Sequence, residues 1–109
     1  MRTWIATVLL GAFLAAVPSP GPALAQELGN AADGQRFSRE VCAACHAVEK
    51  GDKMISLDGA PPFQDIADDP AASEVGLRVF LRSPHEGMPD LILSDEESDD
   101  VVAYILSLR

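Results

Sequence analysis

The sequence predicts an all-α fold in which three main helices are separated by two long loops. Apolar residues recur at helical spacing in three segments, and the sequence shows no alternating strand pattern of useful length. Between these segments lie the glycine, aspartate and proline breaks that are typical of loops. The 109 residues fit one small domain. Long structureless loops are unusual in such a domain and are often functional.

The first 25 residues are typical of a secretory signal rather than of the fold. Arg2 gives a positive start, residues 4–17 are almost wholly apolar, and prolines follow within residues 18–22. Ala23-Leu24-Ala25 supplies the small-x-small pattern of a cleavage site. The apolar run is shorter than the roughly 20 residues that a membrane span needs. We therefore expect Sec-type export to the periplasm, cleavage of residues 1–25, and a mature domain of residues 26–109 without a membrane span.

The first half of the mature chain predicts one helix, one loop and one short turn. Asn30 can cap a helix over residues 31–44, with acidic Asp33 near its positive end. Residues 50–62 should form a loop because glycines, aspartates and prolines interrupt them. Residues 63–67 are expected to form a short helical turn.

The second half predicts two further helices. Pro70 or Ser73 should open the first of these, over residues 72–82. A second loop with glycine and proline follows it. Ser94 begins the last helix, and Glu97 three residues later completes the sequence pattern of a capping box.

The mature chain is strongly acidic and poor in aromatic side chains. Loss of Arg2 leaves seven Lys+Arg against 17 Asp+Glu, a formal charge of −10. This excess excludes nucleic acid as a partner, because phosphate binding needs a basic footprint, and it predicts a partner with a basic docking surface. The mature domain keeps four aromatic residues, which are Phe37, Phe63, Phe80 and Tyr104. So small a core usually needs disulfides, a metal or a large cofactor.

Cys42-Ala43-Ala44-Cys45-His46 is a C-x-x-C-H motif, which is typical of c-type haem attachment. Two thiols three positions apart can each add to a vinyl group of one porphyrin, and His46 then presents its imidazole to the iron. Zinc would need a second ligand pair, which is missing, and a thioredoxin-like redox pair would need a βαβ frame. A disulfide between the two cysteines is a third alternative in an oxidising compartment. None of these three uses His46, the export signal and the thin core together.

Over nearly all of residues 30–108 the sequence resembles the small class I monohaem cytochromes c of bacteria. The motifs that carry this resemblance are, in order, Gly34 and Phe37, Cys42 to His46, Ala60-Pro61-Pro62-Phe63, Gly87-Met88-Pro89-Asp90 and Tyr104-Ile105-Leu106-Ser107-Leu108. The C-x-x-C-H element is highly specific, and the others gain strength from their order and spacing. The resemblance implies a cytochrome c fold wrapped around one haem c that is bound covalently through Cys42 and Cys45.

The resemblance also implies that His46 and Met88 are the two axial ligands of the iron. Met88 lies 42 positions after His46, beyond a helix that can carry the chain across the porphyrin face. Met54 lies only eight positions after His46, so we expect it to be core filler or exposed. His85, three positions before Met88, is the rival ligand. A neutral thioether favours Fe(II) and raises the reduction potential.

Supporting roles follow from the same resemblance. Pro61 is expected to bind the second nitrogen of His46 through its backbone carbonyl, which makes it part of the cofactor site. Gly34 should let the first helix cross the last one closely, with Phe37 and Tyr104 packed there. The mature chain has no Trp to bind a haem propionate. The remaining candidates for that role are Lys53, Arg78 and Arg82.

An iron with both axial positions filled exchanges one electron and leaves no position for a substrate. The predicted function is therefore a soluble periplasmic electron carrier, not an enzyme, that exchanges electrons with redox proteins. Two alternatives stay open. The chain could be the electron-accepting subunit of a periplasmic dehydrogenase rather than a free monomer, or a gas sensor or enzyme in which Met88 leaves the iron.

Overall fold

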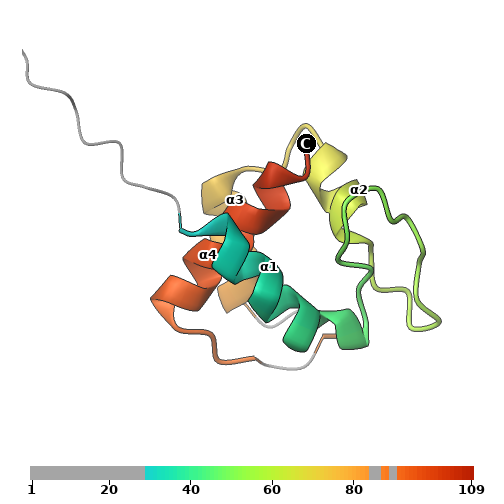
Figure 1. Cartoon of the computed structure of the whole chain (residues 1–109), viewed down its shortest axis with the longest axis horizontal. Helices are drawn as coiled ribbons and strands as arrows, with labels where there is room; N and C mark the ends of the chain where they lie inside the picture. Colours follow the sequence, from blue (N-terminus) through green and yellow to red (C-terminus); the bar gives the residue numbers. More distant parts are fainter. Residues whose placement is uncertain (1–28, 84–86, 89–90) are drawn as a thin grey trace, which may run out of the picture.

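Helices α1 and α4 cross at the centre of the fold. In the computed structural model, which describes residues 29–83, 87–88 and 91–109, α1 covers Ala31–Glu40 and α4 covers Asp95–Ser107. The helices α2 (Phe63–Asp68) and α3 (Glu74–Arg82) pack against α4 (Figure 1). The residues described contain no strand, which confirms the all-α prediction.

The crossing depends on a glycine. Gly34 is buried, and a Cβ added to it would overlap the carbonyl oxygen of Asp100 and lie 3.0 Å from the Cβ of Tyr104. The backbone of α1 therefore lies directly on the backbone of α4, as predicted. Phe37 packs against the buried cluster that contains Tyr104, which confirms the expected contact at the crossing.

The apolar core is small and centres on α4. Its buried apolar side chains are Val48, Phe63, Ala67, Val101, Val102, Tyr104, Ile105 and Leu108. Only two of the four aromatic residues are among them, and Phe80 is 54% exposed. This agrees with the expectation that the domain needs apolar mass from outside the chain.

The first helix is shorter than predicted. Helix α1 ends before Val41, and Cys42–Ala44 form a separate 3₁₀ turn. The prediction of one helix over residues 31–44 is therefore wrong at its C-terminal end. The turn is tighter than an α-helix because the Cys42 carbonyl accepts from the Cys45 N–H at 3.1 Å as well as from the His46 N–H at 2.9 Å.

The helix starts agree with the predictions. The Asn30 side chain accepts hydrogen bonds from two backbone N–H groups in the first turn of α1. Ser73, not Pro70, caps α3. Both halves of the capping box between Ser94 and Glu97 are present at α4. These bonds satisfy N–H groups that a helix start otherwise leaves without partners.

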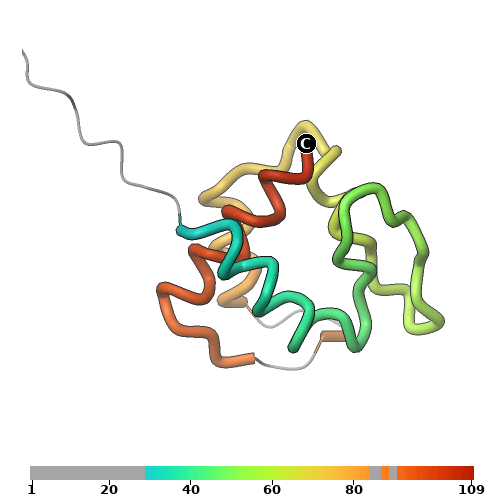
Figure 2. The backbone as a smooth tube through the Cα atoms, in the orientation of Figure 1, coloured from blue at the N-terminus to red at the C-terminus, as the bar shows by residue number. Residues whose placement is uncertain are grey.

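A long loop leads from the cysteines to α2. Figure 2 shows residues 45–62 as an excursion that leaves the end of the 3₁₀ turn and returns beside α2. Gly51 and Gly59 take φ values of 78° and 77° in it, a left-handed conformation that favours glycine. No helix within the described ranges is long and apolar enough to cross a membrane. The predicted signal and His85 lie outside the described residues.

Candidate functional site

The C-x-x-C-H motif lies where α1 gives way to the long loop. Cys42 is half-buried against the core cluster, and Cys45 is exposed. Both thiols are free, so the two cysteines do not form a disulfide in this structure. Burial raises the pKa of the Cys42 thiol. The His46 backbone N–H donates to the Cys42 carbonyl at 2.9 Å, which holds the motif in a single turn.

One backbone carbonyl orients the imidazole of His46. Its Nδ1 lies 2.7 Å from the carbonyl oxygen of Pro61. Because a carbonyl oxygen can only accept, Nδ1 carries the proton, and the free lone pair is on Nε2. This is the tautomer that can bind a metal through Nε2 while its other nitrogen is held by the protein. The structure thus brings His46 and Pro61 together.

Neighbouring contacts hold the same part of the chain. The Phe63 backbone N–H donates to the carbonyl of Ala47 at 2.9 Å. The Phe63 ring lies 5.4 Å from the His46 ring, centroid to centroid, at an angle of 52°. Tyr104 fixes the next residue, Val48, through its hydroxyl. His46 is therefore held by Pro61 just before α2, Ala47 by the first residue of α2, and Val48 by Tyr104 of α4.

Met88 lies in the second loop. It is half-buried and follows Gly87, whose φ is 81°. The rival His85 falls outside the residues that the structure describes. Ligation by Met88 therefore stays a prediction. Met54 is 71% exposed, which agrees with the expectation that it is either core filler or exposed.

The three candidate partners of a haem propionate are all paired with carboxylates of the same chain. Lys53 lies 3.1 Å from Asp65 and 3.0 Å from Asp68. Arg78 and Arg82 make their ion pairs with Glu74, Asp99 and Asp95. Each cation therefore already has an anionic partner.

The acidic residues of α4 also have structural partners that the sequence did not suggest. Asp100 accepts a hydrogen bond from the backbone N–H of Asn30 at 2.6 Å. Asp99 and Asp95 are paired with arginines of α3. These contacts could not be predicted from the sequence, because the partners lie up to 70 residues away along the chain.

Sequence reasoning also missed Gln64. The residue is buried, with 7% exposure, and its side chain hydrogen-bonds to Gly51 in the long loop, to Leu108 at the end of α4 and to Asp68 of its own helix. A buried amide between a loop, a helix and the chain's last turn is visible only once these are assembled. No motif marks it in the sequence.

The donor set and its surroundings fit a haem. Two free thiols and one imidazole with Nε2 free match the chemistry that attaches and binds a haem. Large apolar side chains are also more than half exposed in the long loop, in α3 and near α4. These are Met54, Ile55, Leu57, Val75, Val79, Phe80 and Ile92. Apolar side chains that the small core leaves exposed agree with the need of the domain for a large cofactor.

Fold and site together define an all-α protein that attaches one haem through two thioethers. The chain matches the family model described as cytochrome C oxidase, cbb3-type, subunit III, over residues 29–105. It is 41% identical over 96 residues to cytochrome c-552 of Bradyrhizobium diazoefficiens, and this alignment covers 88% of each chain. No solved structure matches it.

The chain therefore belongs to the cytochrome c family, as a small bacterial monohaem member. Its cofactor is haem c, attached covalently at Cys42 and Cys45. As a cytochrome c it is an electron-transfer protein.

Proposed function

We propose that this chain is a soluble periplasmic electron carrier, exported by residues 1–25, whose haem iron is bound by His46 and Met88. The observation that carries the proposal is the 2.7 Å contact between His46 Nδ1 and the Pro61 carbonyl, which leaves Nε2 free beside the attachment cysteines. When bound, the haem supplies one-electron exchange between Fe(III) and Fe(II). The chain's own residues bind it, orient the imidazole and tune the potential.

Met88 supports the second half of the proposal. It is half-buried, and the left-handed Gly87 before it turns the chain at this point. A thioether is a soft, neutral ligand that favours Fe(II). With both axial positions filled, the protein has no position at which a substrate or gas could bind, and it can exchange an electron with little rearrangement.

The surface charge supports recognition of a basic partner. The mature chain carries a formal charge of −10. The ion pairs within the protein do not change this net charge, so its long-range field remains negative. We expect a redox partner with a basic docking surface, and an electron-transfer rate to that partner that falls as ionic strength rises. A flat or rising salt profile would contradict steering.

Spectroscopy of the ferric protein tests the ligands. We expect the near-infrared sulfur-to-iron charge-transfer band at neutral pH, and no binding of carbon monoxide to the reduced protein. Met88→Leu should abolish the band, lower the reduction potential and allow carbon monoxide to bind. Met54→Leu is the matched control, because it removes the other thioether of the mature chain. A wild-type protein without the band, or one that binds carbon monoxide tightly, would contradict the proposal.

Recovery of the protein from the periplasm tests the export signal. The mature N-terminus should be Gln26, and the mass should correspond to residues 26–109 plus one haem. A membrane-bound protein that retains residues 1–25 would contradict this part of the proposal. Isolation in a stable complex with a dehydrogenase would replace the free carrier with the subunit alternative.

A further inference from the structure

Two stretches of chain, residues 46–53 and 61–68, are bonded to each other from end to end; we call them the paired segments. At one end the His46 Nδ1–H donates to the Pro61 carbonyl at 2.7 Å, and the Phe63 N–H donates to the carbonyl of Ala47 at 2.9 Å. At the other end Lys53 forms ion pairs with acids of α2. The position of the Pro61 carbonyl therefore depends on what keeps the paired segments together.

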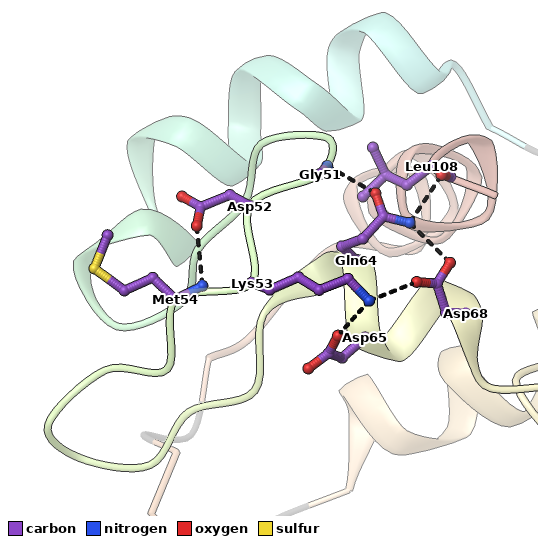
Figure 3. Close-up of polar contacts among 8 residues, drawn as sticks. All are labelled: Gly51, Asp52, Lys53, Met54, Gln64, Asp65, Asp68 and Leu108. Atoms are coloured by element: carbon purple, nitrogen blue, oxygen red, sulfur yellow. Dashed lines mark hydrogen bonds and ion pairs between the residues drawn. The ribbon is translucent and has the colours of Figure 1, made fainter.

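Gln64 is the buried centre of this pairing (Figure 3). Its Oε1 accepts from the Gly51 N–H at 2.8 Å. Its Nε2 donates to Asp68 Oδ1 at 2.8 Å and to the carbonyl of Leu108 at 3.0 Å. One side chain thus connects the segment that follows His46, the helix α2 and the last turn of the chain. Both amide hydrogens and the amide oxygen have partners.

Lys53 forms the outer part of the same network. Its ammonium is paired with Asp65 and Asp68, but all three side chains are 45–59% exposed. Exposed pairs of this kind contribute little and are screened by salt. Gln64 is 7% exposed, and its loss would leave the Gly51 N–H and the Leu108 carbonyl without their partner. The buried amide, rather than the exposed ion pair, should dominate the geometry.

We infer that Gln64 is a positioning residue that sets the hydrogen bond between His46 and Pro61 and thereby tunes the reduction potential. The inference rests on the proposed function, because it needs His46 to be the iron ligand. Gln64 touches neither His46 nor the iron site through any contact described above. It acts by holding Gly51, five residues after His46, against a helix that starts two residues after Pro61.

The direction of the effect follows from the chemistry of the imidazole. A strong hydrogen bond from Nδ1 makes the imidazole a better electron donor, and this stabilises Fe(III). When the paired segments loosen, the Pro61 carbonyl moves away and this stabilisation weakens. Loss of Gln64 should therefore raise the reduction potential and free the Nδ1–H to exchange with solvent.

The test compares Gln64→Met with Asn30→Ala in the holoprotein. Methionine keeps the length and apolar stem of glutamine but removes its donors and acceptor. Asn30→Ala removes the cap of α1 and lowers stability without touching the paired segments. At a fixed applied potential, we expect Gln64→Met to raise the ratio of reduced to oxidised protein about threefold, a smaller change than removal of a direct partner of a ligand causes. Asn30→Ala should leave this ratio unchanged.

Proton NMR of the His46 Nδ1–H gives a second readout that a purely structural role would not move. In Gln64→Met its exchange with solvent should accelerate relative to Asn30→Ala at matched stability. Lys53→Gln should change both readouts less than Gln64→Met does. Gln64→Glu, which keeps the shape and the acceptor but loses both donors, replaces Gln64→Met if that variant does not fold.

Equal potentials and equal Nδ1–H exchange in Gln64→Met and Asn30→Ala would overturn the inference. Loss of folded holoprotein in both Gln64 variants would also overturn it, because Gln64 would then serve stability alone. Failure of the proposed function is distinguishable, since it appears in the wild-type spectra. A wild-type protein that shows His46 and Met88 ligation, with unresponsive Gln64 variants, rejects only the role of Gln64.

Discussion

The crossing of α1 with α4 and the paired segments beside His46 are held by different forces. At the crossing, backbone lies on backbone at Gly34, and the nearby buried side chains are mostly apolar. In the paired segments the contacts are hydrogen bonds and ion pairs, with Gln64 at their buried centre. The first region tolerates no added volume, and the second depends on the hydrogen-bond partners of the buried Gln64.

This difference corresponds to what each region has to do. Apolar packing is non-directional and contributes stability in proportion to the area buried. Hydrogen bonds contribute less net stability, but they fix direction. The imidazole of His46 needs a fixed direction, and it is held by the Pro61 carbonyl in the polar region. We expect substitutions at the crossing to change stability most, and substitutions in the paired segments to change the redox site.

The largest expected effect is that of Gly34→Ala. The new methyl group would overlap the carbonyl oxygen of Asp100, so α1 must shift away from α4. We expect a loss of about 3 kcal/mol in the free energy of unfolding, measured by denaturant titration of the holoprotein. Gly76→Ala is the matched control in α3, where the added Cβ meets no backbone and only the capping hydroxyl of Ser73, 2.9 Å away, has to turn. A loss no larger than that of the control would mean that the crossing is not tightly packed.

Tyr104→Phe connects the two regions and should have an intermediate effect. It keeps the ring at the crossing but removes the hydroxyl that donates to the buried Val48 carbonyl at 2.7 Å. We expect a loss of about 1.5 kcal/mol in the free energy of unfolding, because one buried acceptor loses its partner. Denaturant titration measures it. A loss as large as that of Gly34→Ala would show that Tyr104 stabilises the fold mainly through its hydroxyl. It would contradict the conclusion that apolar packing holds the crossing of α1 with α4.

Lys53→Gln should lower stability by less than Tyr104→Phe. The carboxylates of Asp68 and Asp65 raise the pKa of Lys53, so its contribution is present below the ordinary lysine pKa and is lost as pH rises through the raised value. The ion pairs are exposed, and salt should remove the difference from wild type. Thermal unfolding at low and high ionic strength measures it. A loss of stability that does not depend on salt would instead indicate that the aliphatic part of the Lys53 side chain stabilises the fold by packing.

The smallest expected effect is a pH dependence at Asp68. Hydrogen bonds from Lys53 and from Gln64 lower the pKa of its carboxyl. A lowered pKa gives stability that is present above the ordinary aspartate value, near pH 4, and is lost as pH falls through the folded value. Asp68→Asn should therefore differ from wild type at neutral pH and converge with it in acid. Melting temperatures at matched ionic strength over that range test this; a constant difference would exclude the ionised form as the cause.

Much of the fold could be predicted from local signals. Asn30 and Ser94 mark helix starts because short polar side chains satisfy N–H groups within their own first turn. The C-x-x-C-H motif predicts its cofactor because the chemistry needs those residues at that spacing. Gly34 was predictable as a close crossing only through the family resemblance. In each case the information lies within a few residues or within a shared motif.

The end of α1 and the role of Gln64 could not be predicted in this way. A continuous helix over residues 31–44 satisfies local preferences, but the structure ends α1 at Glu40 and forms a separate 3₁₀ turn over Cys42–Ala44. Gln64 has partners 13 and 44 residues away, and no neighbouring residue in the sequence predicts these contacts.

The sequence by itself determined the helix starts, the acidic surface and the attachment of haem c, because each depends on neighbouring residues or on composition. Only the tertiary structure decided which nitrogen of His46 faces the Pro61 carbonyl, the pairing of the basic residues and the network around Gln64. These depend on atoms that are brought together from distant positions, and hydrogen bonds act over about 3 Å regardless of separation along the chain.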